Sequence, residues 1–123
     1  MVDKWGIFLV NLNPVQGSEQ KGQRPVLVVS NEAVNKNLPI CTIIPFSSYK
    51  GYEKIYPTEL IINKIDTGLS KDSILMVQQI RTIDQARIVE TKVGEIKNEI
   101  IKNEINKAEL EEIIILPTHQ KRK

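Results

Sequence analysis

The chain has 123 residues, 41% of them hydrophobic, and carries a formal net charge of +2 with one cysteine and one histidine. A chain of this size buries one small core, so we expect a single domain. The lone Cys41 excludes an intrachain disulfide and suits a reducing cytoplasm. No apolar run approaches the roughly 18 residues that cross a bilayer. We therefore expect a cytoplasmic protein with no membrane partner, and the small net charge does not by itself indicate nucleic-acid binding.

In chain order, the sequence predicts short strands followed by one helix. Six β-branched or apolar runs, bounded by Gly, Pro, Asn or Asp, predict strands over residues 5–12, 24–30, 40–46, 58–63, 73–80 and 86–96. Between them, residues 31–37 predict a short helical turn capped by Asn31, and residues 66–68 predict a turn. Six strands in so short a chain favour a barrel and a mainly β fold.

The last predicted element is an amphipathic helix from residue 97 to about residue 115. Ile101, Ile105 and Ala108 recur at helical spacing, with Glu and Lys on the other face. Pro117 is expected to end this helix, and the residues after it are expected to form a flexible basic tail.

The most informative stretch runs from residue 17 to residue 31, where a polar, glycine-containing loop leads into an apolar strand. Pro25 directs Arg24 toward extended geometry, which places Arg24 at the lip of the strand. There its planar, charged guanidinium is able to bind a phosphate through two hydrogen bonds, with Glu19 and Gln20 supplying a carboxylate and an amide nearby. A turn with a solvated arginine is the alternative interpretation.

Other kinds of site can be weighed by elimination. A zinc site needs several Cys or His ligands, the chain has no recognisable carboxylate cluster for magnesium, and no glycine-rich phosphate loop occurs. Ser47 and Ser48 have no well-placed histidine to activate a nucleophile. We therefore expect no metal and no cofactor. What remains is phosphate chemistry by arginine, hydroxyl and amide groups, which suits RNA because that substrate carries its own nucleophile, the 2′-OH.

A second candidate binding segment covers residues 49–56. Its tyrosines and lysines surround a flexible glycine, a pattern that stacks bases while attracting the backbone of a single strand. The residues are Tyr49, Lys50, Gly51, Tyr52, Lys54 and Tyr56. An ordinary solvated loop is the alternative.

Three ordered motifs resemble those of the MazF/PemK/Kid family of toxin-antitoxin ribonucleases. They are Gly-Ser-Glu-Gln at 17–20, Arg-Pro-Val-Leu-Val-Val-Ser-Asn-Glu at 24–32, and Gln-Gln-Ile-Arg-Thr-Ile-Asp at 78–84. The resemblance runs from about residue 5 to residue 116, which implies one domain over 1–116 and a tail over 117–123. It also implies a compact SH3-like β-barrel with a C-terminal helix, of α+β character, that forms a homodimer.

The resemblance implies roles for individual residues. Arg24 would bind the scissile phosphate, Ser47 would supply a hydroxyl with Ser48 as the alternative, and Glu19 is a possible proton acceptor. The implied or inferred substrate-binding residues are Ser18, Gln20, Ser48, Tyr49, Lys50, Lys54, Gln79 and Arg81. Arg81 has an alternative role as a structural partner of Asp84.

This chain departs from the family at three positions. Many members have Gly-Asp or Gly-Glu where it has Trp5 and Gly6, an acid where it has Gln78, and some have a histidine where it has Ser18. Two acids and a histidine are thus missing, and the family's proton-transfer scheme does not transfer directly. Trp5 is expected to pack in the core or at a dimer interface rather than to stack on a base.

The leading hypothesis is the toxin of a toxin-antitoxin system. It would be a sequence-specific, metal-independent endoribonuclease that cleaves single-stranded mRNA or rRNA by 2′-OH attack, leaving a 2′,3′-cyclic phosphate and a 5′-OH. A cognate antitoxin would neutralise it. The alternatives are a topoisomerase-poisoning toxin that acts by protein binding, and a catalytically silent RNA-binding barrel.

Overall fold

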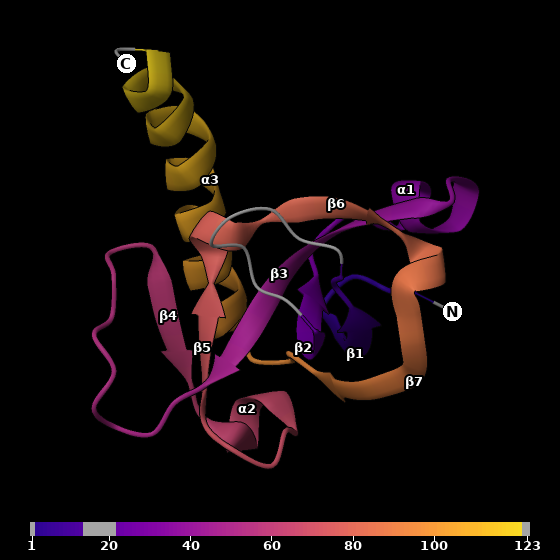
Figure 1. Cartoon of the computed structure of the whole chain (residues 1–123), viewed down its shortest axis with the longest axis horizontal. Helices are drawn as coiled ribbons and strands as arrows, with labels where there is room; N and C mark the ends of the chain where they lie inside the picture. The colour runs from indigo at the N-terminus through magenta and orange to yellow at the C-terminus, as the bar shows by residue number, and fades with distance from the viewer. Residues whose placement is uncertain (1, 14–21, 122–123) are drawn as a thin grey trace.

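The computed structural model describes residues 2–13 and 22–121. Within them the chain forms a seven-stranded sheet and a long C-terminal helix (Figure 1). The strands are β1 (Gly6–Asn11), β2 (Gln23–Val28), β3 (Ile40–Ser48), β4 (Glu59–Ile62), β5 (Ser73–Met76), β6 (Arg81–Asp84) and β7 (Ile88–Glu95). The helices are α1 (Glu32–Asn37), α2 (Lys64–Thr67) and α3 (Glu99–Lys121), with 3-10 turns η1 (Val77–Gln79) and η2 (Gln85–Arg87).

The strand order is β4-β5-β3-β2-β1-β7, and all pairs are antiparallel. The long strand β3 lies diagonally across the molecule and changes partners along its length (Figure 1). Its first residues pair with β6, its middle with β2 and its last residues with β5. Within the described residues β4 and β7 do not pair with each other, so the sheet coils without closing into a complete barrel. The expected mainly β fold with a C-terminal helix is confirmed.

Hydrophobic side chains form a cluster on each face of the sheet, as strand alternation dictates. One cluster lies under α3 and includes Ile7, Leu27, Ile44, Phe46, Leu75, Ile105 and Ala108. The other fills the concave side and includes Phe8, Val10, Val26, Val28, Cys41, Ile43 and Ile83. The sheet is therefore buried on both faces along β1, β2 and β3, which gives the start of β2 a rigid support.

The sequence-based strand boundaries fail between β5 and β7. The strand expected over 73–80 ends at Met76, and the strand expected over 86–96 begins after the turn η2. A seventh strand, β6, was missed because its four residues include two charged ones and pair only with the first half of β3. The expected turn at 66–68 is the end of the short helix α2, where Gly68 adopts φ +82°.

The two expected helices are present, with one wrong boundary. Asn31 caps α1 as expected, because its side chain accepts a hydrogen bond from Val34 N at 3.0 Å. Asn98 precedes α3 and accepts from Ile100 N at 2.9 Å. The expected end of α3 at Pro117 is wrong, because the helix continues to Lys121 and includes residues 117–121. The fixed φ of proline is compatible with a helix, which then lacks one backbone hydrogen bond.

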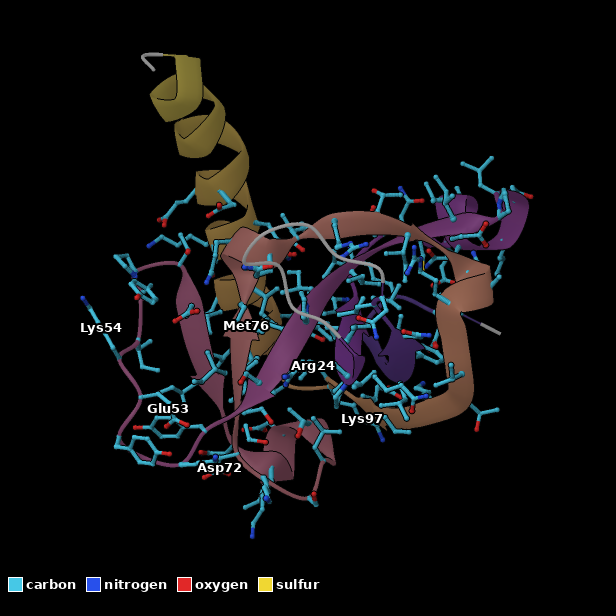
Figure 2. All side chains as sticks on the ribbon, viewed as in Figure 1. Arg24, Glu53, Lys54, Asp72, Met76 and Lys97 are labelled. Carbon is cyan, nitrogen blue, oxygen red and sulfur yellow. The ribbon has the colours of Figure 1, made fainter. Side chains whose placement is uncertain are left out.

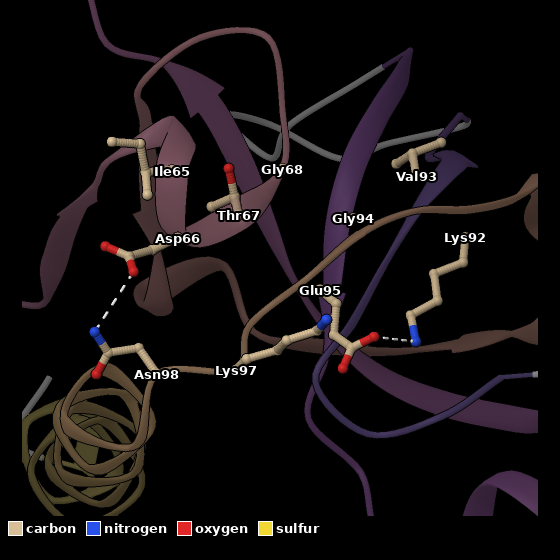
Figure 3. Close-up of a pocket in the computed structure, with 10 residues that line it drawn as sticks. All are labelled: Ile65, Asp66, Thr67, Gly68, Lys92, Val93, Gly94, Glu95, Lys97 and Asn98. Atoms are coloured by element: carbon tan, nitrogen blue, oxygen red, sulfur yellow. Dashed lines mark hydrogen bonds and ion pairs between the residues drawn. The ribbon is translucent and has the colours of Figure 1, made fainter.

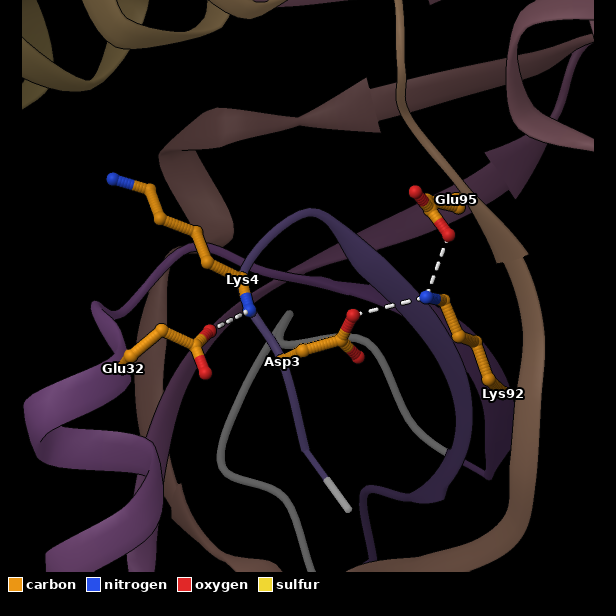
Figure 4. A network of polar contacts seen from close by, with 5 residues as sticks. All are labelled: Asp3, Lys4, Glu32, Lys92 and Glu95. Atoms are coloured by element: carbon orange, nitrogen blue, oxygen red, sulfur yellow. Dashed lines mark hydrogen bonds and ion pairs between the residues drawn. The ribbon is translucent and has the colours of Figure 1, made fainter.

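Polar contacts hold the segment before β1 against the rest of the sheet (Figure 4). Lys92 Nζ lies 2.9 Å from Asp3 Oδ2 and 2.6 Å from Glu95 Oε1, and Lys4 N donates to Glu32 Oε1 at 2.8 Å. Hydrogen bonding to Glu95, and then to Asp3, raises the pKa of Lys92. These contacts tie the N-terminal segment to β7 and α1.

Trp5 has φ +73°, in the left-handed region that favours glycine. It packs against the cluster under α3, and the Nζ atoms of Lys4 and Lys102 lie 5.3 and 5.5 Å from its ring centroid. This is the position where the resemblance places a glycine. Packing and cation-π contacts offset the backbone strain that a tryptophan brings there.

Candidate functional site

Arg24 and Ser47 occupy the point where β2 and β3 separate. The two strands pair from Val28 to Val26, and the pairing stops before Pro25, which has no N–H to donate. Continuing that register by two residues sets Arg24 opposite Ser47 on the same face of the sheet. There β3 has already turned to β5, so a fork opens between the two side chains.

The same register separates the two candidate hydroxyls. Ser47 pairs with Ile74 and is half-buried, whereas Ser48 pairs with Ser73 and is exposed. Because successive residues of a strand point to opposite faces, Ser47 shares the face of Arg24 and Ser48 does not. The geometry therefore favours Ser47 as the hydroxyl nearest Arg24.

Three predicted site residues, Ser18, Glu19 and Gln20, lie outside the described residues. The two flanks of their loop are well fixed. Leu12 N donates to Gly22 O at 3.0 Å, and Gly22 N donates to Asn13 Oδ1 at 3.1 Å. Val10 pairs with Arg24 in the same ladder, so both flanks lie close to Arg24.

Arg87 binds the segment that precedes this loop, a contact that the sequence does not predict. Its Nη1 donates to the carbonyls of Asn11 at 3.2 Å and Asn13 at 2.6 Å. The two acceptors are far from Arg87 in sequence, so only the pairing of β1 with β7 could have revealed the contact.

The segment 49–56 joins β3 to β4 and is built from two turns that glutamates close. Lys50 N donates to both oxygens of Glu53, at 2.9 and 3.2 Å, across Gly51, which has φ +101°. Burial alone would raise the pKa of Glu53, but backbone hydrogen bonds, that of Lys50 foremost, outweigh it and lower the pKa. We call residues 49–56 the tyrosine loop.

Two rings of the tyrosine loop face solvent. Tyr52 is 78% exposed and Tyr56 is 52% exposed, and Lys54 Nζ lies 5.3 Å from the centroid of the Tyr56 ring. Tyr49 is half-buried and donates its N–H to Asp72 O at 2.8 Å, while Lys50 is exposed. Lys54 lies at the outer edge of the loop, across β4 and β5 from Arg24 (Figure 2). The structure thus does not bring Lys54 next to Arg24.

The third motif lies in η1 and β6. Gln79 is a half-buried residue of η1, and Arg81 is half-buried at the start of β6, where it pairs with Ile43. Asp84, the expected partner of Arg81, accepts a hydrogen bond from Ala86 N at 2.8 Å. Gln78, at the position of a family acid, donates from Nε2 to Glu59 Oε2 at 2.6 Å. This contact joins the third motif to the end of the tyrosine loop.

Other features of the described part of the chain lie apart from this site. No group of three or more His, Cys, Asp or Glu there is placed to hold a metal ion, and no helix there is long and apolar enough to cross a membrane. Burial, with a smaller effect of Asp84, raises the pKa of Cys41 to about 11, so its thiol stays protonated. A cavity of about 460 Å³ between α2, β7 and the start of α3 contains none of the predicted site residues (Figure 3).

Comparisons with known proteins agree with this architecture. A family model described as PemK-like, MazF-like toxin of type II toxin-antitoxin system matches residues 3–116. MazF from Deinococcus radiodurans aligns with a TM-score of 0.73 at 23% identity, covering 88% of this chain and 92% of that one. An endoribonuclease in complex with its cognate antitoxin, from a mycobacterial species, aligns with a TM-score of 0.72 at 18% identity, covering 94% and 97%. The toxin MazF-mt6 of Mycobacterium tuberculosis aligns with a TM-score of 0.67 at 18% identity, covering 85% and 91%.

Proposed function

Because the chain belongs to the PemK-like, MazF-like toxin family of type II toxin-antitoxin systems, we propose that it is an endoribonuclease toxin. Its substrate is single-stranded RNA, cut at specific sequences in mRNA or rRNA. A structural neighbour that is itself an endoribonuclease supports this assignment. What supports the proposal within this chain is that β2 and β3 stop pairing at Val26 and Pro45, just before Arg24 and Ser47, where β3 pairs with β5 instead.

The fork suits a phosphate diester. Adjacent strands lie about 5 Å apart, and the separation grows once β3 turns to β5, so a phosphate fits between a guanidinium and a hydroxyl placed there. Arg24 offers paired N–H donors to two phosphate oxygens, and Ser47 donates one further hydrogen bond. Both stabilise the charge that builds on the phosphate oxygens in the transition state.

The proposed reaction is an internal displacement. The 2′-oxygen of the scissile nucleotide forms a bond to phosphorus, and the bond from phosphorus to the 5′-oxygen of the next nucleotide breaks. The 2′-OH proton passes to a base, for which we propose Glu19, and the departing 5′-oxygen takes up a proton from the site or from solvent. The products carry a 2′,3′-cyclic phosphate and a 5′-OH. Water is not the nucleophile in this scheme, and no metal is required.

We also propose that the protein acts in the cytoplasm as a homodimer and that a cognate antitoxin neutralises it. The neighbouring structure of an endoribonuclease in complex with its cognate antitoxin supports the latter. An extended acidic antitoxin segment that covers Arg24 would compete with RNA through charge and by exclusion. Simultaneous full-affinity binding of antitoxin and RNA would contradict this arrangement.

The test is incubation of the purified protein with a long mixed-sequence RNA in EDTA, followed by mass spectrometry of the fragments. We expect cyclic phosphate and 5′-OH ends, and no cut where the scissile nucleotide is 2′-deoxy. A 5′-phosphate end, dependence on magnesium or cleavage of the deoxy substrate would show a water or metal mechanism. Binding without cleavage would instead identify a silent RNA-binding protein, and neither binding nor cleavage would leave a toxin that acts on another protein.

A further inference from the structure

Glu59 connects two segments that the sequence predicts to bind RNA. Its Oε1 accepts a hydrogen bond from Tyr56 N at 2.9 Å, at the end of the tyrosine loop. Its Oε2 accepts from Gln78 Nε2 at 2.6 Å, in the third motif. The residue is half-buried at the start of β4, and each carboxylate oxygen has one of these two donors. Hydrogen bonds to a charged acceptor are about twice as strong as neutral ones.

The contact with Tyr56 closes a turn in both directions. Glu59 N donates to Tyr56 O at 2.9 Å while the Glu59 carboxylate accepts from Tyr56 N. Pro57 follows Tyr56 and restricts the same turn. The backbone of Tyr56, whose ring is half exposed, is thus held at a fixed position relative to β4.

The contact with Gln78 fixes the other segment. Thr58 Oγ1 lies 3.4 Å from Gln78 Oε1, so both ends of the Gln78 amide have a partner from the same turn. The amide cannot rotate by half a turn without placing its oxygen against the Glu59 carboxylate. Gln78 is the middle residue of η1, which Ile80 N closes by donating to Val77 O at 3.0 Å. Its neighbour Gln79 is the proposed RNA-binding residue of this turn.

We call Glu59 and its two partners, Tyr56 and Gln78, the Glu59 corner. The strand register places Glu59 on the face of the sheet that carries the fork. Glu59 pairs with Met76 on β5, and Ser47 on β3 pairs with Ile74, two residues before Met76. Residues two apart on a strand share a face, so Glu59 and Ser47 point to the same side. They lie two strands apart and two residues apart along the strand direction, which together amount to about 12 Å. A single strand bound at the fork therefore reaches the Glu59 corner within a few nucleotides.

We propose that Glu59 is a positioning residue for base recognition. It fixes the position of the Tyr56 end of the tyrosine loop relative to the turn that contains Gln79. The exposed Tyr56 ring and the Gln79 amide can then contact neighbouring bases of the same RNA strand. The carboxylate beside Gln78 also restores, from β4, a negative charge at the corner where the resemblance places an acid at position 78. The inference rests on the proposed function for the identity of its ligand, and on the two hydrogen bonds of Glu59 for its geometry.

The test compares Glu59→Ala, Glu59→Gln and Gln78→Ala with a matched control, Glu104→Gln, which changes an exposed acid on α3. Cut ends are mapped on a diverse RNA pool. We expect Glu59→Ala to flatten the base preference at one or two positions beside the cut and to lower kcat/KM roughly 10-fold or more, mainly through KM. Glu59→Gln keeps one acceptor oxygen and should have an intermediate effect. Gln78→Ala should flatten the same positions, and the double variant Glu59→Ala with Gln78→Ala should be no worse than Glu59→Ala.

An unchanged base profile in Glu59→Ala, or a uniform loss of rate at all sequences, would overturn the inference. Amide hydrogen exchange without RNA separates it from the proposed function. We expect the Tyr56 N–H to exchange at least about 10-fold faster in Glu59→Ala and unchanged in Glu104→Gln, because only the first removes its acceptor. If the wild type leaves RNA intact, the proposed function fails. The link through Glu59 is then supported by faster Tyr56 exchange in Glu59→Ala and overturned by unchanged exchange.

Discussion

Gly94 of β7 packs directly against the backbone carbonyl of Thr67, the last residue of α2. A Cβ at Gly94 would overlap that oxygen and would lie 3.4 Å from Ile7 Cδ1, a core side chain. We predict that Gly94→Ala lowers the free energy of unfolding by about 2 kcal/mol, because both neighbours belong to packed elements and cannot move freely. Denaturant titration measures this, with Thr91→Ala on an exposed position of the same strand as control. An unchanged denaturation midpoint for Gly94→Ala would show that α2 can shift away from β7 at little energetic cost.

Removal of the guanidinium of Arg24 should abolish cleavage and leave the fold intact. Arg24 is a half-buried residue near the start of β2, outside the paired part of β2 and β3, so Arg24→Ala removes the proposed phosphate contact and little core packing. Arg24→Lys should rescue poorly, because a point charge lacks the planar fork. Single-turnover cleavage rates measure this, with circular dichroism to check the fold. Comparable rates for wild type and Arg24→Ala would reject the assignment.

The two serines after Phe46 should differ in their effects. Ser47→Ala is expected to slow cleavage about 10² to 10³-fold, by analogy with loss of one donor from an oxyanion site. Ser48→Ala should have little effect on the chemical step, because Ser48 points to the other face of β3. The measurement is the cleavage rate at saturating RNA. A larger loss in Ser48→Ala would move the hydroxyl role to that residue.

The sequence predicts the elements that depend on local patterns. The apolar runs of β1, β2 and β3, the cap at Asn31 and the spacing of Ile101, Ile105 and Ala108 are local signals, and each corresponds to an observed element. The break after Met76 is different. Val77 is fully buried and β6 pairs with the first half of β3, so the chain turns there for tertiary reasons that no local pattern contains.

The same distinction holds for the candidate site. Arg24 stands out in the sequence because a proline follows it, and Ser47 because the resemblance places a hydroxyl at its position. The position of Arg24 relative to Ser47 depends on where β3 stops pairing with β2 and begins to pair with β5. Only the pairing register shows where this change occurs. Glu59 carries no sequence signal, because an acid at the start of a short strand is common on a surface. Its role appears only through contacts with Tyr56 on one side and Gln78 on the other.

The last prediction concerns Glu109, a half-buried residue of α3. Its Oε1 has no hydrogen-bond partner among the described residues, and burial raises its pKa to about 6, against a smaller opposing effect of the Lys4 charge. In the unfolded chain a glutamate has a pKa of about 4.3. Between about pH 4.3 and pH 6 the folded protein therefore holds a proton that the unfolded chain has lost. This contribution to stability is greatest below that window and is lost as the pH rises through it.

We therefore expect Glu109→Gln, which is neutral at every pH, to raise the free energy of unfolding at pH 7.5 by about 1 to 2 kcal/mol. The gain should shrink at pH 4.5, where the wild-type carboxyl is already protonated in the folded state. Urea titrations of both proteins at the two pH values measure the difference. Glu104→Gln, an exposed position on the same helix, is the control and should show no such pH dependence. An equal effect of Glu109→Gln at both pH values would mean that packing of the side chain, rather than its charge, controls how α3 docks on the sheet.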